Sequence, residues 1–493
     1  MMRFVFALAV LASPAVAQVK FTDMSQSLGS HSYDGGWEHF VGGGVAVMDC
    51  NGDTRPDIFA AGGANPAAMW VNDGDFQFTP APLPEMTETV GAYPLDIDGD
   101  GVMDLYVMRV GPDMALKGTG DCRFTDATAD WGIPQTDQWT TAFTAWWEDG
   151  TRPVMAVGHY VDRSNPDGPF FACDSNTILR PGADGYVAEW LEPGFCPLSM
   201  LVATDARGRM TLRLSNDRQY YVRGGYEQMW DIKDRRFLGP DDGWNKISLW
   251  GMGIASADIN GDGLDEVMLT SMGDQLLQIA QSDGTYTRAP YDIGTYAQRP
   301  YLGGDGRPST GWHSEFADVD NDGRQDLFIA KGNVDQMPTN AMADPNNLLM
   351  QQPDGTFTEV AATAGLADVR RGRGAALVDF DGDGRLDLVV MNRRADIALY
   401  RNDTPNTGHW LGLDLSQPDG NTRGIGTRVI LRTPQGQQTR EVRIGGGHAG
   451  GQAMHLHFGL GTATQAEVTI TWPDGTTTTQ TLPANTTAKI AHP

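Results

Sequence analysis

Residues 379–391 read DFDGDGRLDLVVM, and this stretch decides the fold because close copies of it recur along the chain. Each copy has an apolar approach, a loop of the form D-x-[D/N]-G-D-G-x-x-D or a close variant, and then a second apolar run. Small, β-branched and aromatic residues alternate on both sides, which predicts strand, loop and strand without a helical period. The five copies begin at Asp49, Asp96, Asp258, Asp318 and Asp379, and each loop is named below by that first residue.

The spacing within each loop suits a calcium ion. Oxygens at positions 1, 3 and 5 point inward from a tight turn, position 7 offers a backbone carbonyl, and a carboxylate at position 9 closes the shell. An EF-hand closes instead with a Glu at position 12 on a helix, so that alternative fails. We therefore predict four to five Ca²⁺ sites, whose ligands at positions 1, 3, 5, 7 and 9 are Asp49, Asn51, Asp53, Arg55 and Asp57; Asp96, Asp98, Asp100, Val102 and Asp104; Asp258, Asn260, Asp262, Leu264 and Glu266; Asp318, Asp320, Asp322, Arg324 and Asp326; and Asp379, Asp381, Asp383, Arg385 and Asp387.

Charge favours an ion in these loops. A single loop of this kind could equally be an Asx-rich turn without metal. Across the five copies, however, positions 1, 3, 5 and 9 hold 18 carboxylates and two Asn, and gathering them without a counter-ion costs on the order of several kcal/mol per loop. The Asp96, Asp318 and Asp379 loops carry complete signatures.

Two loops depart from the pattern. Thr54 stands where the other loops have Gly, at a position that usually needs a positive φ, which a β-branched residue resists. The Asp258 loop closes with Glu266, which is longer by one methylene, and the neighbouring Asp265 is an alternative ligand.

The spacing of the loops predicts a ring of seven units. The gap of 162 residues between the second and third loops holds two degenerate copies, TAWWEDGTRPVMAVG (144–158) and ATDARGRMTLRLSND (203–217), which have lost their ligands. Each unit of 47 to 61 residues accommodates about four short strands, the size of a propeller blade. We expect an all-β, seven-bladed β-propeller, in which VKFTDMSQSLG (19–29) supplies the outer strand of the seventh blade and so removes an exposed edge.

The N-terminus predicts export. Arg3, an apolar run from Phe4 to Ala12 and a small-x-small site predict a signal peptide over residues 1–17, cut after Ala17. The apolar run is too short to span a membrane, so we expect a protein that is secreted or periplasmic and not inserted in a membrane. The net charge of -27 argues against nucleic acid or an anionic membrane surface as a partner.

The four cysteines are expected to pair in an exported chain. Four cysteines allow three connectivities. The favoured one joins Cys173 to Cys196 across a short Gly/Pro-rich stretch and therefore Cys50 to Cys122; the alternative is that Cys50 is a buried free thiol.

At this point the repeats resemble the FG-GAP, or VCBS-like, repeats of integrin α-subunit propellers. The tail reads GHWLGLDL from Gly408, then NTRGIGTRVIL, HLHFGLG and VTITWPDGTTT, and it resembles the ASPIC/UnbV domain. The whole is similar to the cartilage acidic protein family and its bacterial relatives. The resemblance implies a secreted, calcium-binding, non-enzymatic propeller over residues 18–405, followed by a β-sandwich-like domain over 406–493. Such a protein would act as a binding or adhesion module for an extracellular glycan or protein.

Catalytic signatures are sparse in the sequence. His455 and His457 would share one face of a strand, as a metal pair should, but no carboxylate or Cys lies near them. The nucleophile elbow, the zinc-protease helix and the P-loop are absent, so we predict no catalytic residues.

A calcium-dependent polysaccharide lyase remains the alternative function. The insertion from His159 to Trp230, which carries Arg163, Arg180, Arg218 and Arg223, could line a pocket for an acidic glycan. A lyase predicts that Tyr220→Phe or His159→Ala abolishes its activity. The aromatic residues Trp146, Trp147, Tyr221, Trp230, Trp244 and Trp250 are either inter-blade core or a surface on which sugars stack.

Overall fold

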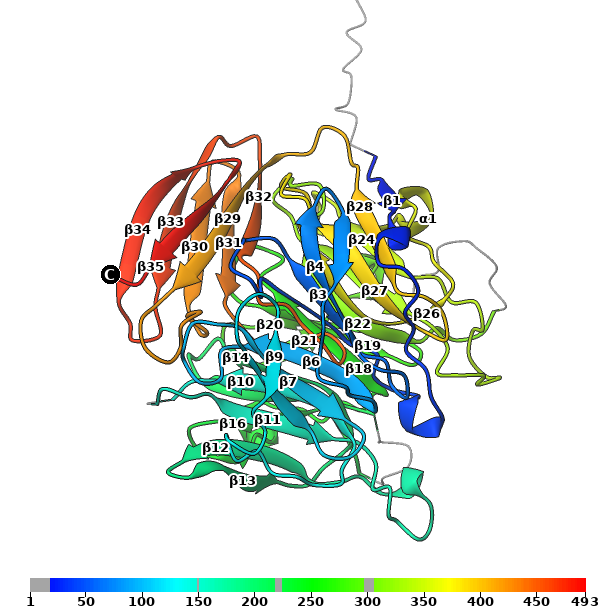
Figure 1. Ribbon diagram of the computed structural model, residues 1–493. Coiled ribbons are helices and arrows are strands. Elements are labelled where there is room, and N and C mark those ends of the chain that lie inside the picture. The colour runs from blue at the N-terminus through cyan, green and yellow to red at the C-terminus, as the bar shows by residue number, and fades with distance from the viewer. Residues whose placement is uncertain (1–17, 149, 218–223, 297–305) are drawn as a thin grey trace, which may run out of the picture.

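The computed structural model describes residues 18–148, 150–217, 224–296 and 306–493, and strands dominate it (Figure 1). The predicted signal peptide and the candidates Arg218, Tyr220, Tyr221 and Arg223 lie outside these ranges. Across the described residues, no helix combines the length and apolar character that a membrane crossing requires.

Strands β1 to β28 form seven four-stranded sheets in the described part of the chain. The first three are β2 (Val45–Met48), β3 (Asp57–Ala60), β4 (Ala68–Gly74) and β5 (Gln77–Pro80); β6 (Thr89–Leu95), β7 (Asp104–Arg109), β8 (Met114–Gly118) and β9 (Phe124–Asp126); and β10 (Thr140–Trp146), β11 (Val154–His159), β12 (Asn176–Gly182) and β13 (Gly185–Leu191). The next three are β14 (Pro197–Thr204), β15 (Met210–Asn216), β16 (Gln228–Asp231) and β17 (Arg236–Phe237); β18 (Gly251–Ala257), β19 (Glu266–Ser271), β20 (Leu276–Ala280) and β21 (Tyr286–Arg288); and β22 (Gly311–Ala317), β23 (Asp326–Lys331), β24 (Asn347–Gln351) and β25 (Phe357–Glu359).

The last of the seven sheets joins the two ends of the ring. It contains β26 (Arg371–Val378), β27 (Asp387–Arg393), β28 (Ala398–Asn402) and, outermost, β1 (Phe21–Asp23). Strand β1 pairs antiparallel with β28, with Phe21 opposite Asn402, so the N-terminal segment takes the predicted closing position. The first strands of successive sheets lie side by side, and β26 lies beside β2, which closes the ring of a β-propeller.

Helical structure is confined to short segments in the described ranges. There is one helical turn, α1 (Ala361–Ala364), with the 3₁₀ turns η1 (Ser25–Ser27), η2 (Trp37–His39), η3 (Pro169–Phe171), η4 (Pro240–Asp242) and η5 (Tyr291–Ile293). The propeller core lies between the sheets, where apolar residues of neighbouring blades pack together. Trp146, Trp230 and Trp244 are buried there, and Trp147 and Trp250 pack against it half-buried, which is the inter-blade role expected for most of the aromatic residues.

Strands β29 to β35 form two further sheets, called here the C-terminal module, drawn in orange to red beside the ring in Figure 1. One sheet has the order β32–β29–β35 and the other β31–β30–β33–β34. Alternating residues of both sheets build a common apolar core, as in a β-sandwich. The strands are β29 (His409–Ser416), β30 (Arg428–Thr433), β31 (Gly436–Glu441), β32 (Leu456–Gly461), β33 (Gln465–Thr471), β34 (Thr477–Pro483) and β35 (Thr486–Ala491).

A segment of the C-terminal module enters the centre of the ring. Residues 444–452, called here the central plug, leave the module between β31 and β32 and form β-bridges with the first strands of five sheets. Gly446 N–H donates to Met200 O (2.7 Å) and Gly447 N–H to Ile254 O (2.7 Å). His448 in the plug is fully buried and contacts the ring of Trp312 at 5.0 Å between centroids. The central plug therefore links the first strands of five sheets from the centre of the ring.

Candidate metal centres

The five acidic loops occupy equivalent places in the propeller. Each connects the first two strands of a sheet, namely β2–β3, β6–β7, β18–β19, β22–β23 and β26–β27. The two degenerate copies lie at the corresponding connections, β10–β11 and β14–β15. The sequence repeat is thus a repeat of structure.

A common hydrogen-bond pattern shapes these loops. In the Asp379 loop, the first carboxylate accepts the N–H groups of Gly382 and Gly384, both at 2.8 Å. The closing carboxylate, Asp387, accepts the N–H of Phe380 (2.8 Å) and that of Asn402 on the third strand (2.8 Å). The other loops place the carboxylates of positions 1 and 9 against backbone N–H groups in the same way. Backbone geometry therefore turns these oxygens toward one another.

Three loops bring three carboxylates together. Their oxygens lie within 4.8 Å of one another in the sets Asp96, Asp98 and Asp104; Asp318, Asp320 and Asp326; and Asp379, Asp381 and Asp387. These are the three loops with complete signatures. The other two have Asn at position 3, which offers a neutral oxygen in place of a charged one. Clusters of hard oxygen donors at this separation could hold a metal ion, and their chemistry fits calcium.

Burial makes the uncompensated charge of these clusters costly. Desolvation, reinforced by neighbouring carboxylates, raises the pKa of Asp104 to about 7 and that of Asp379 to about 6. For Asp326 and Asp387 the pKa lies well above the usual range for the same reasons. A bound cation would remove this penalty, because it stabilises the ionised form.

At position 7 the side chain also takes part in the loop, whereas the sequence pattern predicts only a backbone carbonyl there. In the Asp379 loop, Arg385 Nε donates to Asn402 O on the third strand (2.7 Å) while its guanidinium pairs with Asp383 at position 5. Arg55 and Arg324 repeat this bridge in their loops. In the Asp96 loop position 7 is Val, and Lys117 takes over by bonding Asp100 (2.7 Å) and Asp98. Arg recurs at position 7 in three of the five loops, and this recurrence could have indicated a role for the side chain.

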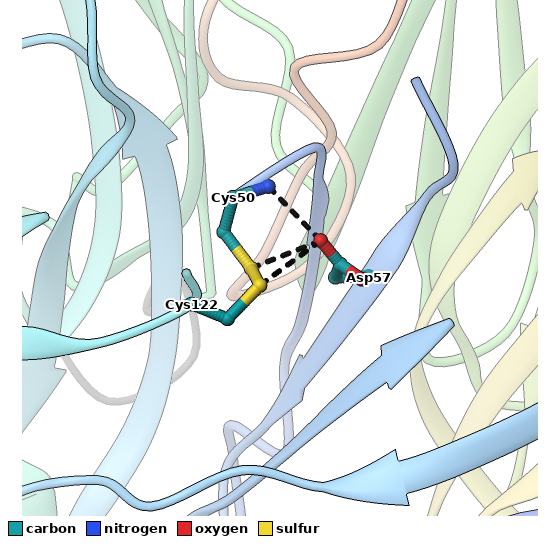
Figure 2. Close-up of side chains that lie close together, drawn as sticks. All are labelled: Cys50, Asp57 and Cys122. Carbon is teal, nitrogen blue, oxygen red and sulfur yellow. Dashed lines mark hydrogen bonds between the residues drawn. A yellow bond between two sulfur atoms is a disulfide. The ribbon is translucent and has the colours of Figure 1, made fainter. Parts of the chain in front are cut away.

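The Asp49 loop is cross-linked to the neighbouring blade. Cys50 forms a disulfide with Cys122, and Figure 2 shows Asp57 facing both sulfur atoms, with Oδ2 2.9 Å and 3.2 Å from them. The same oxygen accepts the Cys50 N–H (2.9 Å), so the closing carboxylate keeps the orientation seen in the other loops. The second disulfide joins Cys173 and Cys196. Both pairings agree with the favoured connectivity.

Thr54 adopts the positive φ predicted for its position, 71°. We expect Thr54→Gly to stabilise the calcium-loaded protein by about 1 kcal/mol. A non-glycine residue at positive φ costs roughly 1–3 kcal/mol, and this gain is reduced by about 0.5–1 kcal/mol because glycine loses more conformational entropy on folding. Chemical unfolding in calcium measures the change. The matched variant, Gly101→Thr at the equivalent position of the Asp96 loop (φ 87°), should lose stability. Equal effects of the same sign would contradict this reading.

The Asp258 loop closes through Glu266. Its carboxylate accepts the Ile259 N–H (3.1 Å), and burial raises its pKa to about 8. The alternative ligand, Asp265, instead pairs with Arg443 of the C-terminal module. This leaves Glu266 at the closing position.

The C-terminal module rests directly on four of the acidic loops. Thr422 Oγ1 donates to Asp96 Oδ2 (2.5 Å), and Gly461 N–H donates to Asn321 O in the Asp318 loop (2.8 Å). Arg428 bonds Gly263 O in the Asp258 loop, and Trp410 packs on Gly384 in the Asp379 loop. These loops therefore form a platform for the module rather than a free face.

The two histidines of the tail, His455 and His457, contact different residues. His457 Nε2 lies 2.7 Å from Asn321 Oδ1, and its ring stacks on Trp410. His455 lies beside Gly412. None of the metal-ligand clusters found among the described residues includes either histidine.

The residues of the lyase alternative do not gather into a site where they are described. His159 is buried at 3% exposure between Thr140 and Thr177 (3.2 Å to each), and desolvation lowers its pKa to about 3. Arg163 pairs with Glu38 and Asp137, and Arg180 with Glu148 and Glu189. In these contacts, His159, Arg163 and Arg180 have structural roles.

Comparison with known proteins places both parts of the chain. The model of the FG-GAP-like repeat matches residues 49–107, 258–329 and 318–390, and that of ASPIC and UnbV matches residues 417–493. Cartilage acidic protein 1 of Mus musculus is 28% identical over 32% of this chain, and that of Homo sapiens is 29% identical over 32%. The matches span about a quarter of the length of these relatives, 25% and 24%.

A comparison of folds adds solved structures with low sequence identity. The crystal structure of BBS1N in complex with ARL6DN superimposes with a TM-score of 0.46 at 9% identity, over 76% of this chain and 94% of that one. The sequence matches establish what the motifs indicated: the chain carries FG-GAP-like repeats followed by an ASPIC and UnbV domain, and about a third of it is similar to cartilage acidic protein 1.

Proposed function

We propose that this protein is an exported, calcium-binding β-propeller that serves as a non-enzymatic binding module for an extracellular glycan or protein. Export would follow cleavage after Ala17, and the propeller (18–405) and β-domain (406–493) would act as one unit. The observation that carries the proposal is the convergence of three carboxylates in each of three loops, in desolvated surroundings. Calcium is the hard cation whose ligand number and spacing these loops match.

The role proposed for calcium is structural. Four loaded loops would present neutralised surfaces to the C-terminal module, which already contacts them through Thr422, Arg428 and Trp410. Metal bound only in the folded state stabilises that state by mass action. Binding of an outside partner would then use a rigid two-domain body.

Calcium stoichiometry tests this function directly. Elemental analysis of the mature protein should find four or five Ca²⁺ per chain, since five loops carry the spacing. Asp326→Asn should remove one ion, because its buried carboxylate closes the Asp318 loop. The control is Asp354→Asn, a turn residue that bonds Thr356 outside any cluster, and it should leave the count unchanged. A protein that retains no calcium would contradict the proposal.

A further inference from the structure

A groove separates the Asp49 and Asp379 loops from the C-terminal module. Its volume is about 350 Å³, and both parts of the chain line it, with Asp49 and Asp381 on the propeller side and Trp410, Arg423 and Lys489 on the module side. Small-molecule sites occupy roughly 300–1,000 Å³. The groove is thus large enough for one or two sugar units.

The Asp49 loop is the one acidic loop that the module leaves uncovered. In the described residues, positions 49–57 form no hydrogen bond or ion pair with the module. The first carboxylates of the other four loops are buried, with 2% to 6% exposure, whereas Asp49 is half-buried. Five loop positions supply fewer ligands than the six to eight oxygens that calcium takes. A ligand entering the groove can therefore provide an oxygen to this site.

The opposite wall of the groove carries two basic side chains, an indole and one carboxylate, Asp414. Lys489 is exposed and forms no ion pair among the described residues, although the chain as a whole is strongly acidic. Arg423 lies 3.4 Å from Asp414 and faces the same groove. Trp410, whose ring stacks with His457 on one face, adds an indole, the kind of flat surface that packs against sugar rings.

We propose that this groove binds a carboxylated sugar, a uronate, and this rests on the proposed calcium binding. Its carboxylate would lie between the Asp49 loop and Lys489, which offer a hard cation and an ammonium group, both suited to a carboxylate. Its ring would lie beside Trp410. A neutral sugar would leave Lys489 unpaired, and without calcium the carboxylates of Asp49 and Asp381 would repel the ligand.

Isothermal titration of the mature protein with a short galacturonate oligomer tests the proposal. Binding is expected in calcium and should vanish in excess chelator, and the neutral galactose oligomer should not bind. Lys489→Ala should weaken binding at least tenfold. The control, Lys233→Ala, removes the same charge from an exposed site away from the groove and should leave affinity unchanged.

Asp53→Asn supplies an independent readout. It should lower the calcium count by one and abolish uronate binding while the four covered loops remain loaded. A calcium-loaded protein that ignores uronates, or binds them unchanged in Lys489→Ala, overturns the groove assignment and leaves the calcium function standing. If acetate or malate binds as tightly as the galacturonate oligomer, the groove recognises small carboxylates and the assignment to a sugar is wrong. A protein without calcium overturns both proposals.

Discussion

Removing calcium from the mature protein is expected to lower its melting temperature by roughly 10 °C or more. Each ion held at 100 times its Kd stabilises the folded state by about 2.7 kcal/mol, so four sites contribute on the order of 10 kcal/mol. Electrostatics acts in the same direction: the proposed cleavage after Ala17 would remove Arg3 and take the charge from -27 to -28, and five ions would bring it to -18. Differential scanning calorimetry in calcium and in excess chelator measures the shift.

Readdition of metal separates this effect from damage by the chelator. Calcium should restore the melting temperature, whereas Mg²⁺ should restore less, because it demands a near-ideal octahedron and keeps its waters. Asp387→Asn, which alters a buried closing ligand, should reduce the shift, and Asp354→Asn should not. An unchanged melting temperature in chelator would show that the loops are only turns.

Local patterns made the blades and loops predictable. Ligand spacing, turn glycines and flanking apolar runs all lie within about a dozen residues, so one unit can be recognised alone and confirmed by repetition. The closing strand was predictable for the same reason, since residues 21–23 repeat a pattern found at the outer strand of other units. The three carboxylate clusters coincide with the loops whose signatures were complete.

Long-range packing was not predictable in this way. The run IGGGHAGGQ (444–452) has no periodic pattern, and its partners lie some 200 to 400 residues earlier, on the first strands of five sheets. On composition alone, a Gly-rich run of this kind is typical of a loop. Its glycines instead allow close approach: Gly445 lies against Thr144 and Gly450 against Val45. The contacts between the module and the acidic loops also join residues that are far apart in the sequence, so no local pattern predicts them.

The central plug is expected to be the second large contributor to stability. Replacing residues 444–452 by a Gly-Ser linker of equal length should cost more than about 5 kcal/mol. It removes the side-chain hydrogen bonds of His448 with Gly42 N–H (3.1 Å) and with Met252 O (3.1 Å), and that of Gln452 with Glu315 (2.8 Å). Each is worth about 1 kcal/mol, and the apolar packing of Ile444 and Ala449 adds to them. Chemical unfolding measures the loss, and limited proteolysis should show earlier cleavage between the ring and the module.

A single methyl group should reproduce part of this effect, which distinguishes a packed plug from a loosely held loop. Gly91 approaches the plug so closely that a Cβ would overlap Ala449 O, and the backbone there cannot move without breaking the bridges on either side. Gly91→Ala is therefore expected to destabilise by about 2–3 kcal/mol, in the range of overpacked cores. The control is Gly239→Ala, where no atom lies within 4 Å of the added Cβ and φ is -131°, and it should be nearly neutral. If Gly91→Ala were as silent as its control, the segment would not fill the ring in solution, because a close-packed interior has no room for the extra group.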